Sequence, residues 1–302
     1  MPYFDEIAGH AVIKTVLEKA IESPQNGYLL FGSEGLGNHL LAEAFIRALA
    51  EYPKERPLSA HPDIILLERE MNDAGTALKK EISVKAIREL RMRIAGRPSI
   101  AKRMVIYIPE ADRLNEEGVN ALLKSVEEPP AGAVFVFVTH ALAKIPETLL
   151  SRLIQLELKP LSSHQMQEWL TSINSKEPER LLQIANGRPG HALRFLQEES
   201  FMQDVFEAER FVDRILTSTS IGGGFAVIGE WANRIEKKED PVTEWRKAIQ
   251  LWQGALSRKI IEQPTRAEII AKALIRAEQA IGSSISPRII LESQLATHFY
   301  TN

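Results

Sequence analysis

Short apolar runs alternate with helical patterns over the first half of the chain. Between these runs, apolar residues recur three and four positions apart, as in residues 4–23 and 84–94, which is the spacing of one helix face. Strands that alternate with helices are typical of a mostly parallel sheet covered by helices on both faces. The sequence therefore predicts an α/β fold with five buried strands, at residues 28–31, 64–67, 104–108, 134–139 and 154–158.

Polar residues that can cap helices mark three of the predicted helix starts. Ser83 and Asn115 each precede an apolar stripe at helical spacing, and two glutamates follow Asn115, where they suit the positive end of a helix dipole. Ser162 with Gln165 forms the pattern of a capping box. We expect a helix to begin directly after each of these caps.

No strand pattern follows the fifth run, and the rest of the chain has helical patterns only. Breaks at Asp240-Pro241, Pro264 and Ser283–Pro287 separate longer helices, and Gly222–Gly224 is most simply a turn between two of them. We expect three domains: an α/β domain at residues 1–158, a small helical domain at 159–200 and a helical C-terminal domain at 201–302.

Composition excludes several classes of protein. Of the 302 residues, 44% are apolar and 25% are charged, as in ordinary globular proteins. With a net charge of −3, any contact with nucleic acid has to be local. There is no cysteine and the seven histidines lack ligand-like spacing, so we expect no bound metal. The N-terminus lacks a signal-peptide pattern, and the run 133–138 is too short to cross a bilayer, so we expect a cytoplasmic protein without membrane contact.

A glycine-rich turn joins the first predicted strand to the next helix. Gly32, Gly35 and Gly37 lie in this turn, in a strand–loop–helix layout that can hold a nucleotide phosphate on backbone N–H groups. Gly32 and Gly37 match the glycines of a phosphate loop, but Asn38 stands where its lysine belongs and His39 where its hydroxyl belongs. Asparagine carries no charge, and a histidine nitrogen is a poor ligand for Mg²⁺.

The acidic motif that should follow the third strand is also incomplete. Pro109 occupies the position of the Mg²⁺-binding aspartate, and only Glu110 of the usual acidic pair remains. With three parts of the Mg²⁺–ATP machinery absent, we expect no ATP hydrolysis and no cofactor. The turn is then a tight strand-to-helix connection, although weak phosphate binding by its backbone stays open. An autonomous ATPase with unorthodox ligands is the alternative.

Several motifs together resemble the bacterial clamp-loader subunits, which are AAA+ relatives that load the sliding clamp of the replicative DNA polymerase. The run Asn120–Pro130 is similar to the signature of that family, and Thr139 and Leu149–Arg152 follow at matching places. His61-Pro62-Asp63 and residues 82–90 match further family segments, and residues 287–292 are similar to the last helix of the collar domain. The resemblance implies an AAA+ RecA-like domain, then a helical lid domain and a helical collar domain.

Departures from the family pattern indicate which branch of the clamp-loader family the chain resembles. Motor subunits of clamp loaders keep the lysine and acidic motifs, whereas the delta-prime branch loses ATP competence, as Asn38, His39 and Pro109 suggest here. The lid arginine of the motor subunits would fall near Gly190 and is missing. The four-cysteine zinc module of the family is missing as well.

Arg152 is the residue that the resemblance assigns to catalysis in trans. In the family, the arginine of the Ser-Arg-Cys triplet, here Ser151-Arg152-Leu153, reaches the ATP site of the adjacent motor subunit. A guanidinium suits that role because it is permanently charged and offers a planar fork to phosphate oxygens. The alternative is a surface arginine that pairs with Glu147 or Glu157.

A second candidate site is basic. Residues 79–103 contain nine Lys or Arg and two Glu, a local excess that suits a DNA backbone, with Arg91, Arg93 and Arg97 as candidate contacts. A solvated helix face is the alternative.

The resemblance implies a non-hydrolysing member of a hetero-oligomeric ring. Its partners would be the motor subunits, the clamp-opening subunit and primer–template DNA, and it could touch the sliding clamp. A pure assembly scaffold with an idle Arg152 is a further alternative. Ring order and stoichiometry do not follow from the sequence.

Overall fold

The computed structural model describes residues 3–72, 75–259, 264–281 and 285–300. They form two compact units. One comprises Met1–Ser175 with Gly187–Gly190, and the other comprises Lys176–Asn186 with His191–Asn302. The division into three domains at residues 158 and 200 stays a prediction.

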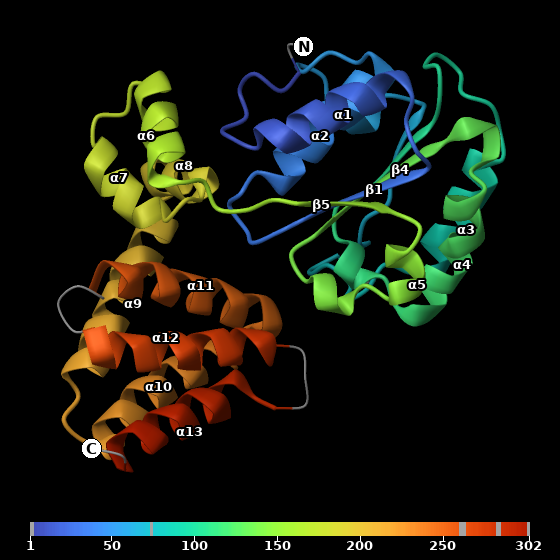
Figure 1. Ribbon diagram of the computed structural model, residues 1–302. Coiled ribbons are helices and arrows are strands. Elements are labelled where there is room, and N and C mark those ends of the chain that lie inside the picture. The colour runs from blue at the N-terminus through green and yellow to red at the C-terminus, as the bar shows by residue number, and fades with distance from the viewer. Residues whose placement is uncertain (1–2, 73–74, 260–263, 282–284, 301–302) are drawn as a thin grey trace. The chain divides into compact units, whose positions relative to one another are not determined.

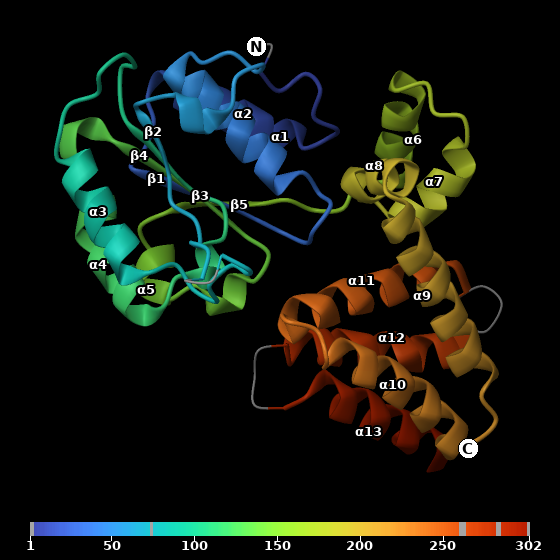
Figure 2. The same cartoon turned by 180° about the vertical axis from the view of Figure 1, so that it is seen from behind.

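The first unit is built on a five-stranded sheet whose strands are all parallel (Figures 1 and 2). The strand order is β2-β3-β4-β1-β5, so β4 and β1 lie in the middle. The predicted parallel α/β sheet is confirmed. Its strands are β1 (Gly27–Phe31), β2 (Ile64–Leu66), β3 (Val105–Ile108), β4 (Val134–Thr139) and β5 (Ile154–Glu157).

Helices cover both faces of this sheet (Figure 1). Successive strand residues point to opposite faces, so Tyr28 and Leu30 pack against α1 and α2 while Leu29 packs with α3, α4 and α5. Two separate apolar cores result. The helices of this unit are α1 (Ala11–Glu22), α2 (Asn38–Ala50), α3 (Val84–Ile94), α4 (Glu116–Glu127), α5 (Glu147–Leu150) and α6 (Ser163–Ser172), with short 3-10 turns at Leu58–Ala60, Ala111–Arg113, Pro130–Gly132 and Leu142–Lys144.

The start of α1 differs from the prediction. The helical pattern extends from residue 4, but α1 begins only at Ala11. Gly9 and His10 have φ of 64° and 54°, in the left-handed region that ends regular helix. Phe4 still lies in the core, packed by the loop that precedes the helix.

The predicted helix caps are confirmed. The Ser83 and Asn115 side chains accept hydrogen bonds from the backbone N–H groups of Ala86 and Gly118. Ser162 and Gln165 form both hydrogen bonds of a capping box.

The second unit is helical throughout its described residues. Proline is the first residue of α11, α12 and α13, where its missing N–H costs nothing, so the predicted breaks at Pro241 and Pro264 are helix starts. Part of the predicted break Ser283–Pro287 lies outside the described residues. The helices are α7 (Pro178–Ala185), α8 (Pro189–Gln197, which begins in the first unit), α9 (Glu199–Thr217), α10 (Ile221–Ile235), α11 (Pro241–Lys259), α12 (Pro264–Gln279) and α13 (Pro287–Tyr300).

The triple glycine is not a turn between helices. Gly222–Gly224 lie in the first turn of α10, and Ser220 caps that helix by accepting from the N–H of Gly223. The cap and the apolar face that follows outweigh the low helix propensity of glycine. Within the described part of the chain, no helix is long and apolar enough to cross a membrane.

Candidate functional site

The glycine turn, the acidic segment and Thr139 meet at the carboxyl ends of neighbouring strands. Phe31 at the end of β1 pairs with Thr139 at the end of β4, and Ile108 at the end of β3 pairs with Phe137. Ligands of parallel sheets bind at this edge, in the crevice outside the strand ends. The topology therefore brings together the residues that an ATP site would use.

Backbone contacts close the glycine turn. Gly32, Gly35 and Gly37 all have positive φ, and a Cβ at Gly32 would lie 2.5 Å from the carbonyl oxygen of Leu158. Gly190 at the start of α8 donates its N–H to the Gly35 carbonyl at 2.9 Å. A Cβ at Gly190 would meet the Gly35 backbone at 2.9 Å, so an arginine cannot stand at this position without moving the turn.

The Asn38 side chain points into the glycine turn. Its side chain is buried and donates from Nδ2 to the carbonyl oxygen of Gly32 at 3.3 Å. A lysine that neutralises nucleotide phosphates needs a longer side chain and a positive charge. The residue at this position therefore stabilises the turn from inside.

His39 is held by aromatic and polar neighbours. Its Nδ1 shares a hydrogen bond of 2.9 Å with the Tyr107 hydroxyl, and its ring lies 5.4 Å from that of His140. Burial, and then the neighbouring His140, lower the pKa of His39, while burial raises the pKa of Tyr107. Near neutral pH the His39 ring is therefore uncharged and its Nδ1 is already engaged. His140 donates from Nδ1 to the carbonyl oxygen of Gly32 at 2.8 Å, a contact that the sequence did not indicate.

The remaining acidic residue is also engaged. Glu110 accepts two hydrogen bonds from Arg69, at 2.8 and 2.7 Å, in a bidentate ion pair. Thr139 donates from its hydroxyl to Asp112 at 2.9 Å, as expected of a strand-end hydrogen bonder. Glu110 and Asp112 thus each accept a hydrogen bond from another side chain of the same unit.

Arg152 lies in the turn that follows α5. Its Nε and Nη2 both donate to Glu127 at 3.2 Å, and its Nη1 donates to the carbonyl oxygen of Thr148 at 2.8 Å. The partner is thus Glu127 of α4, not Glu147 or Glu157. The Arg152 side chain is one-third exposed, at 33%. Glu127 belongs to the same signature run that precedes the arginine motif, a link that could have indicated this pair.

The basic segment separates into paired and unpaired residues. Arg91, Arg93 and Arg97 are exposed, and none of their side chains has a recorded ion pair or hydrogen bond among the described residues. The ion pairs that the structure records on this segment include Lys85–Glu89, Arg88–Glu117 and Lys102–Glu51. The three arginines suggested by the sequence are therefore available for an external anion.

Asp63 anchors the end of this segment. Its buried carboxylate accepts hydrogen bonds from the backbone N–H groups of Ser99, Ile100 and Ala101, at 2.6, 2.7 and 2.7 Å. Burial alone would raise the pKa of Asp63, but the three N–H donors outweigh it and hold the pKa below its ordinary value. The sequence offered Asp63 only as part of the family resemblance, without this role.

A parallel sheet of this order, with a phosphate-loop turn after β1, is the AAA+ type of nucleotide fold. A profile of the family described as "DNA polymerase III, delta subunit" matches residues 9–162, which is about half of the chain. The chain belongs to this family. The resemblance to clamp-loader delta-prime subunits is thereby confirmed.

Individual relatives agree with this assignment. The chain is 29% identical over 184 residues to the DNA polymerase III subunit delta' of Pseudomonas aeruginosa, covering 54% of this chain and 53% of that protein. It is 25% identical over 285 residues to the subunit tau of Bacillus subtilis, covering 86% of this chain and 48% of that one. A solved RuvB variant of Thermotoga maritima superposes with a TM-score of 0.53 at 16% identity, covering 84% and 89% of the two chains, which supports the fold alone. The chain spans about half the length of these two sequence relatives, or slightly less.

Proposed function

We propose that the chain is a non-hydrolysing, delta-prime-like subunit of a cytoplasmic clamp loader. In this role it supports ATP-driven loading of the sliding clamp and gives Arg152 to the ATP site of a neighbouring motor subunit. The supporting observation is that the side chains at the ATP positions are already engaged: Asn38 with Gly32, His39 with Tyr107, and Glu110 with Arg69.

The engaged side chains disfavour an active ATP site for an electrostatic reason. Phosphoryl transfer depends on Mg²⁺ and a cation that neutralise charge on the β- and γ-phosphates. At this strand edge the lysine is replaced by a neutral amide, and the Glu110 carboxylate is neutralised by Arg69. Binding a metal here would require breaking that bidentate pair.

We expect the isolated chain to show no Mg²⁺-dependent ATP turnover. A phosphate-release assay on the purified chain, with and without excess Mg²⁺, measures this directly. Turnover that depends on Mg²⁺ would instead favour an autonomous ATPase with unorthodox ligands. The His39→Ala variant of the isolated chain is the control, because a contaminating ATPase would give the same rate in both preparations, whereas turnover at the glycine turn would change.

The proposed partners are motor subunits, a clamp-opening subunit and primer–template DNA. The names of the relatives support membership in a DNA polymerase III assembly. Reconstitution with candidate motor subunits, with and without this chain, tests the proposal. Clamp loading that does not change when the chain is omitted would contradict it.

The unpaired arginines are the proposed DNA contacts. In the reconstituted loader, Arg91→Ala, Arg93→Ala and Arg97→Ala together should weaken primer–template binding and lower its salt dependence. Each lost phosphate contact reduces the slope of log K against log salt by about 0.9. Fluorescence anisotropy of labelled primer–template over a range of salt concentrations measures both quantities.

A matched triple variant is available for this test. Lys85→Ala, Arg88→Ala and Lys102→Ala remove the same formal charge, but these residues already have carboxylate partners. We expect a smaller loss of DNA binding from this variant. Equal losses in the two variants would point to general charge rather than to contacts by the three arginines.

A further inference from the structure

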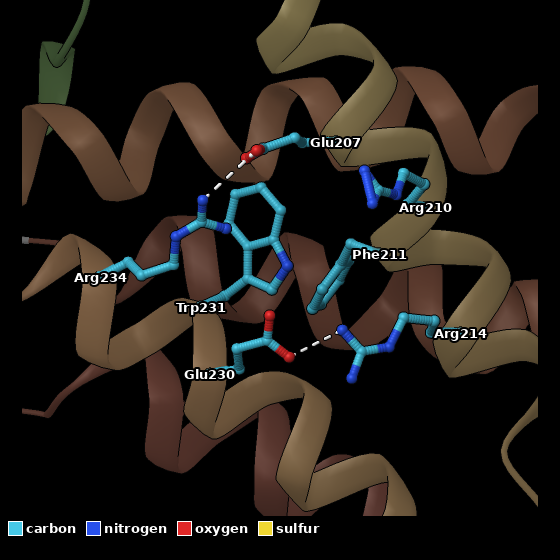
Figure 3. A pocket seen from close by; sticks show the side chains of 7 residues that line it. All are labelled: Glu207, Arg210, Phe211, Arg214, Glu230, Trp231 and Arg234. Atoms are coloured by element: carbon cyan, nitrogen blue, oxygen red, sulfur yellow. Dashed lines mark hydrogen bonds and ion pairs between the residues drawn. The ribbon is translucent and has the colours of Figure 1, made fainter.

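A pocket between α9 and α10 is lined by residues that the sites described above do not involve. It has a volume of about 420 Å³ and is open to solvent. Figure 3 shows its side chains, which all come from these two helices. They are Glu207, Arg210, Phe211, Arg214, Glu230, Trp231 and Arg234.

An aromatic surface forms one wall of the pocket. The Trp231 ring packs edge-on against Phe211 at 5.9 Å and against Trp252 at 5.5 Å, and Phe211 stacks on Trp252 at 3.9 Å. Trp252 is fully buried, whereas Trp231 is only partly buried. The exposed part of the Trp231 ring is therefore an apolar surface held in place by the core.

Ion pairs flank this ring on both sides. Arg214 donates to Glu230 at 2.7 Å and Arg234 donates to Glu207 at 3.3 Å, and both pairs bridge α9 and α10 (Figure 3). The Arg234 guanidinium also lies 5.0 Å from the centre of the Trp231 ring. Each pair is weak by itself at this exposure, but each fixes the direction of a side chain at the pocket.

Arg210 differs from the other two arginines. It lies one helical turn before Arg214 and is exposed, and its side chain has no recorded hydrogen bond or ion pair among the described residues, although its charge, after those of Arg214 and Arg234, lowers the pKa of the Glu230 carboxyl. Figure 3 draws it without a dashed line to the other residues of the pocket. Three arginines against two glutamates leave one net positive charge, and Arg210 is the arginine outside the two ion pairs.

The charge and shape of the pocket limit its ligand. One net positive charge with carboxylates at two edges suits a single carboxylate, because a polyphosphate chain would be repelled by Glu207 and Glu230. The planar fork of Arg210 can bind both oxygens of a carboxylate. The Trp231 ring, in the same pocket, can cover an apolar side chain, and Trp and Arg are enriched among the residues that contribute most to binding at protein interfaces.

We propose that this pocket binds an acidic peptide segment of a partner protein. A carboxylate of the peptide pairs with Arg210, and a neighbouring apolar side chain packs on Trp231. The proposal depends neither on Arg152 nor on the state of the ATP site.

The test uses the full chain and two fluorescein-labelled peptides. The probe is Gly-Ser-Asp-Glu-Leu-Phe-amide, and the comparison peptide has Asn and Gln in place of Asp and Glu. Anisotropy titration should give saturable binding of the acidic peptide, and binding at least about tenfold weaker for the amide peptide, since the charge-assisted bonds are lost. A change in tryptophan fluorescence on adding the unlabelled acidic peptide, absent in the Trp231→Phe variant, reports contact with the ring.

Variants at exposed arginines give the matched comparison. Arg210→Ala removes no recorded hydrogen bond or ion pair, and its electrostatic effect on Glu230 is at the surface, so it should leave the melting temperature close to that of the parent chain and weaken the acidic peptide about tenfold. Arg276→Ala, on an exposed arginine of α12 outside the pocket, should leave the affinity unchanged. Absence of saturable binding, equal binding of both peptides, or an unchanged Kd in Arg210→Ala would overturn the proposal. Displacement of the probe by single-stranded oligothymidylate, through Arg210, would also overturn it and indicate a nucleic-acid site.

Discussion

Replacing Arg152 with alanine is expected to leave the chain folded and to reduce clamp loading by the reconstituted complex at least about tenfold. Arginine fingers raise phosphoryl-transfer rates by roughly 10³–10⁵-fold in other systems, and this finger would serve one site of the ring. Single-turnover ATP hydrolysis and clamp loading on primed DNA, measured with the assembled complex, give the two readouts.

The surroundings of Arg152 explain why it could act away from its own chain. Its pair with Glu127 is partly exposed, and such pairs contribute about 0–1 kcal/mol. The side chain can therefore leave Glu127 for a phosphate at little cost. By the same reasoning, the melting temperature of Arg152→Ala should stay close to that of the parent chain.

Two further variants separate a finger from a structural arginine. Arg152→Lys keeps the charge but loses the planar fork, so it should restore only part of the activity. Glu127→Gln removes the carboxylate that holds Arg152 at 3.2 Å and should not reduce loading. Full activity of Arg152→Ala in the complex would contradict the finger and leave an assembly scaffold as the better description.

Replacing Asp63 with alanine is expected to destabilise the first unit by at least about 3 kcal/mol, because three backbone N–H groups lose their common acceptor, each at roughly 1–3 kcal/mol. Thermal unfolding followed by circular dichroism measures the change. Glu89→Ala is the control, since its ion pair with Lys85 is exposed at 3.8 Å. A shift as small as that of the control would show that water replaces the carboxylate.

The same carboxylate has a predictable dependence on pH. The pKa of Asp63 in the folded chain lies below its ordinary value of 3.8, so the unfolded chain takes up the proton first as the pH falls. The contribution of the Asp63 carboxylate to the free energy of unfolding is complete above about pH 4. It is lost as the pH falls through the pKa of Asp63 in the folded chain. The Asp63→Ala variant should therefore differ from the parent chain near pH 7 and approach it in strong acid.

The sequence predicted the sheet and several helix starts because their signals are local. Apolar runs of strand length and polar caps such as Ser83 and Asn115 act within a few residues of chain. The predicted start of α1 was wrong because the apolar pattern continues through Gly9 and His10. The left-handed backbone of these two residues is not encoded in that pattern. Gly222–Gly224 were assigned to a turn because propensity was weighed without the cap at Ser220.

The candidate site could be predicted in its residues but not in its contacts. Asn38, His39 and Pro109 are visible as departures from a spacing rule, yet the partners of His39 and Glu110 are distant in the sequence. Tyr107 lies 68 positions from His39, and Arg69 lies 41 positions from Glu110. Such pairs depend on strand order, which a single sequence specifies only through the completed fold. The α9–α10 pocket was missed because it depends on how these two helices pack in the completed fold.

The contacts around the glycine turn also bear on how this chain could evolve. A lysine at position 38 alone would place an ammonium group where the present side chain is 2% exposed, which is costly without a phosphate beside it. An arginine at position 190 would displace the Gly35 backbone, and an aspartate at position 109 would adjoin a glutamate already paired with Arg69. Each of these single changes would thus meet the present packing or pairing around the turn. Under the proposed non-hydrolysing role, an ATP site would need several coordinated changes at once, and selection would act on what the fold offers to neighbouring subunits.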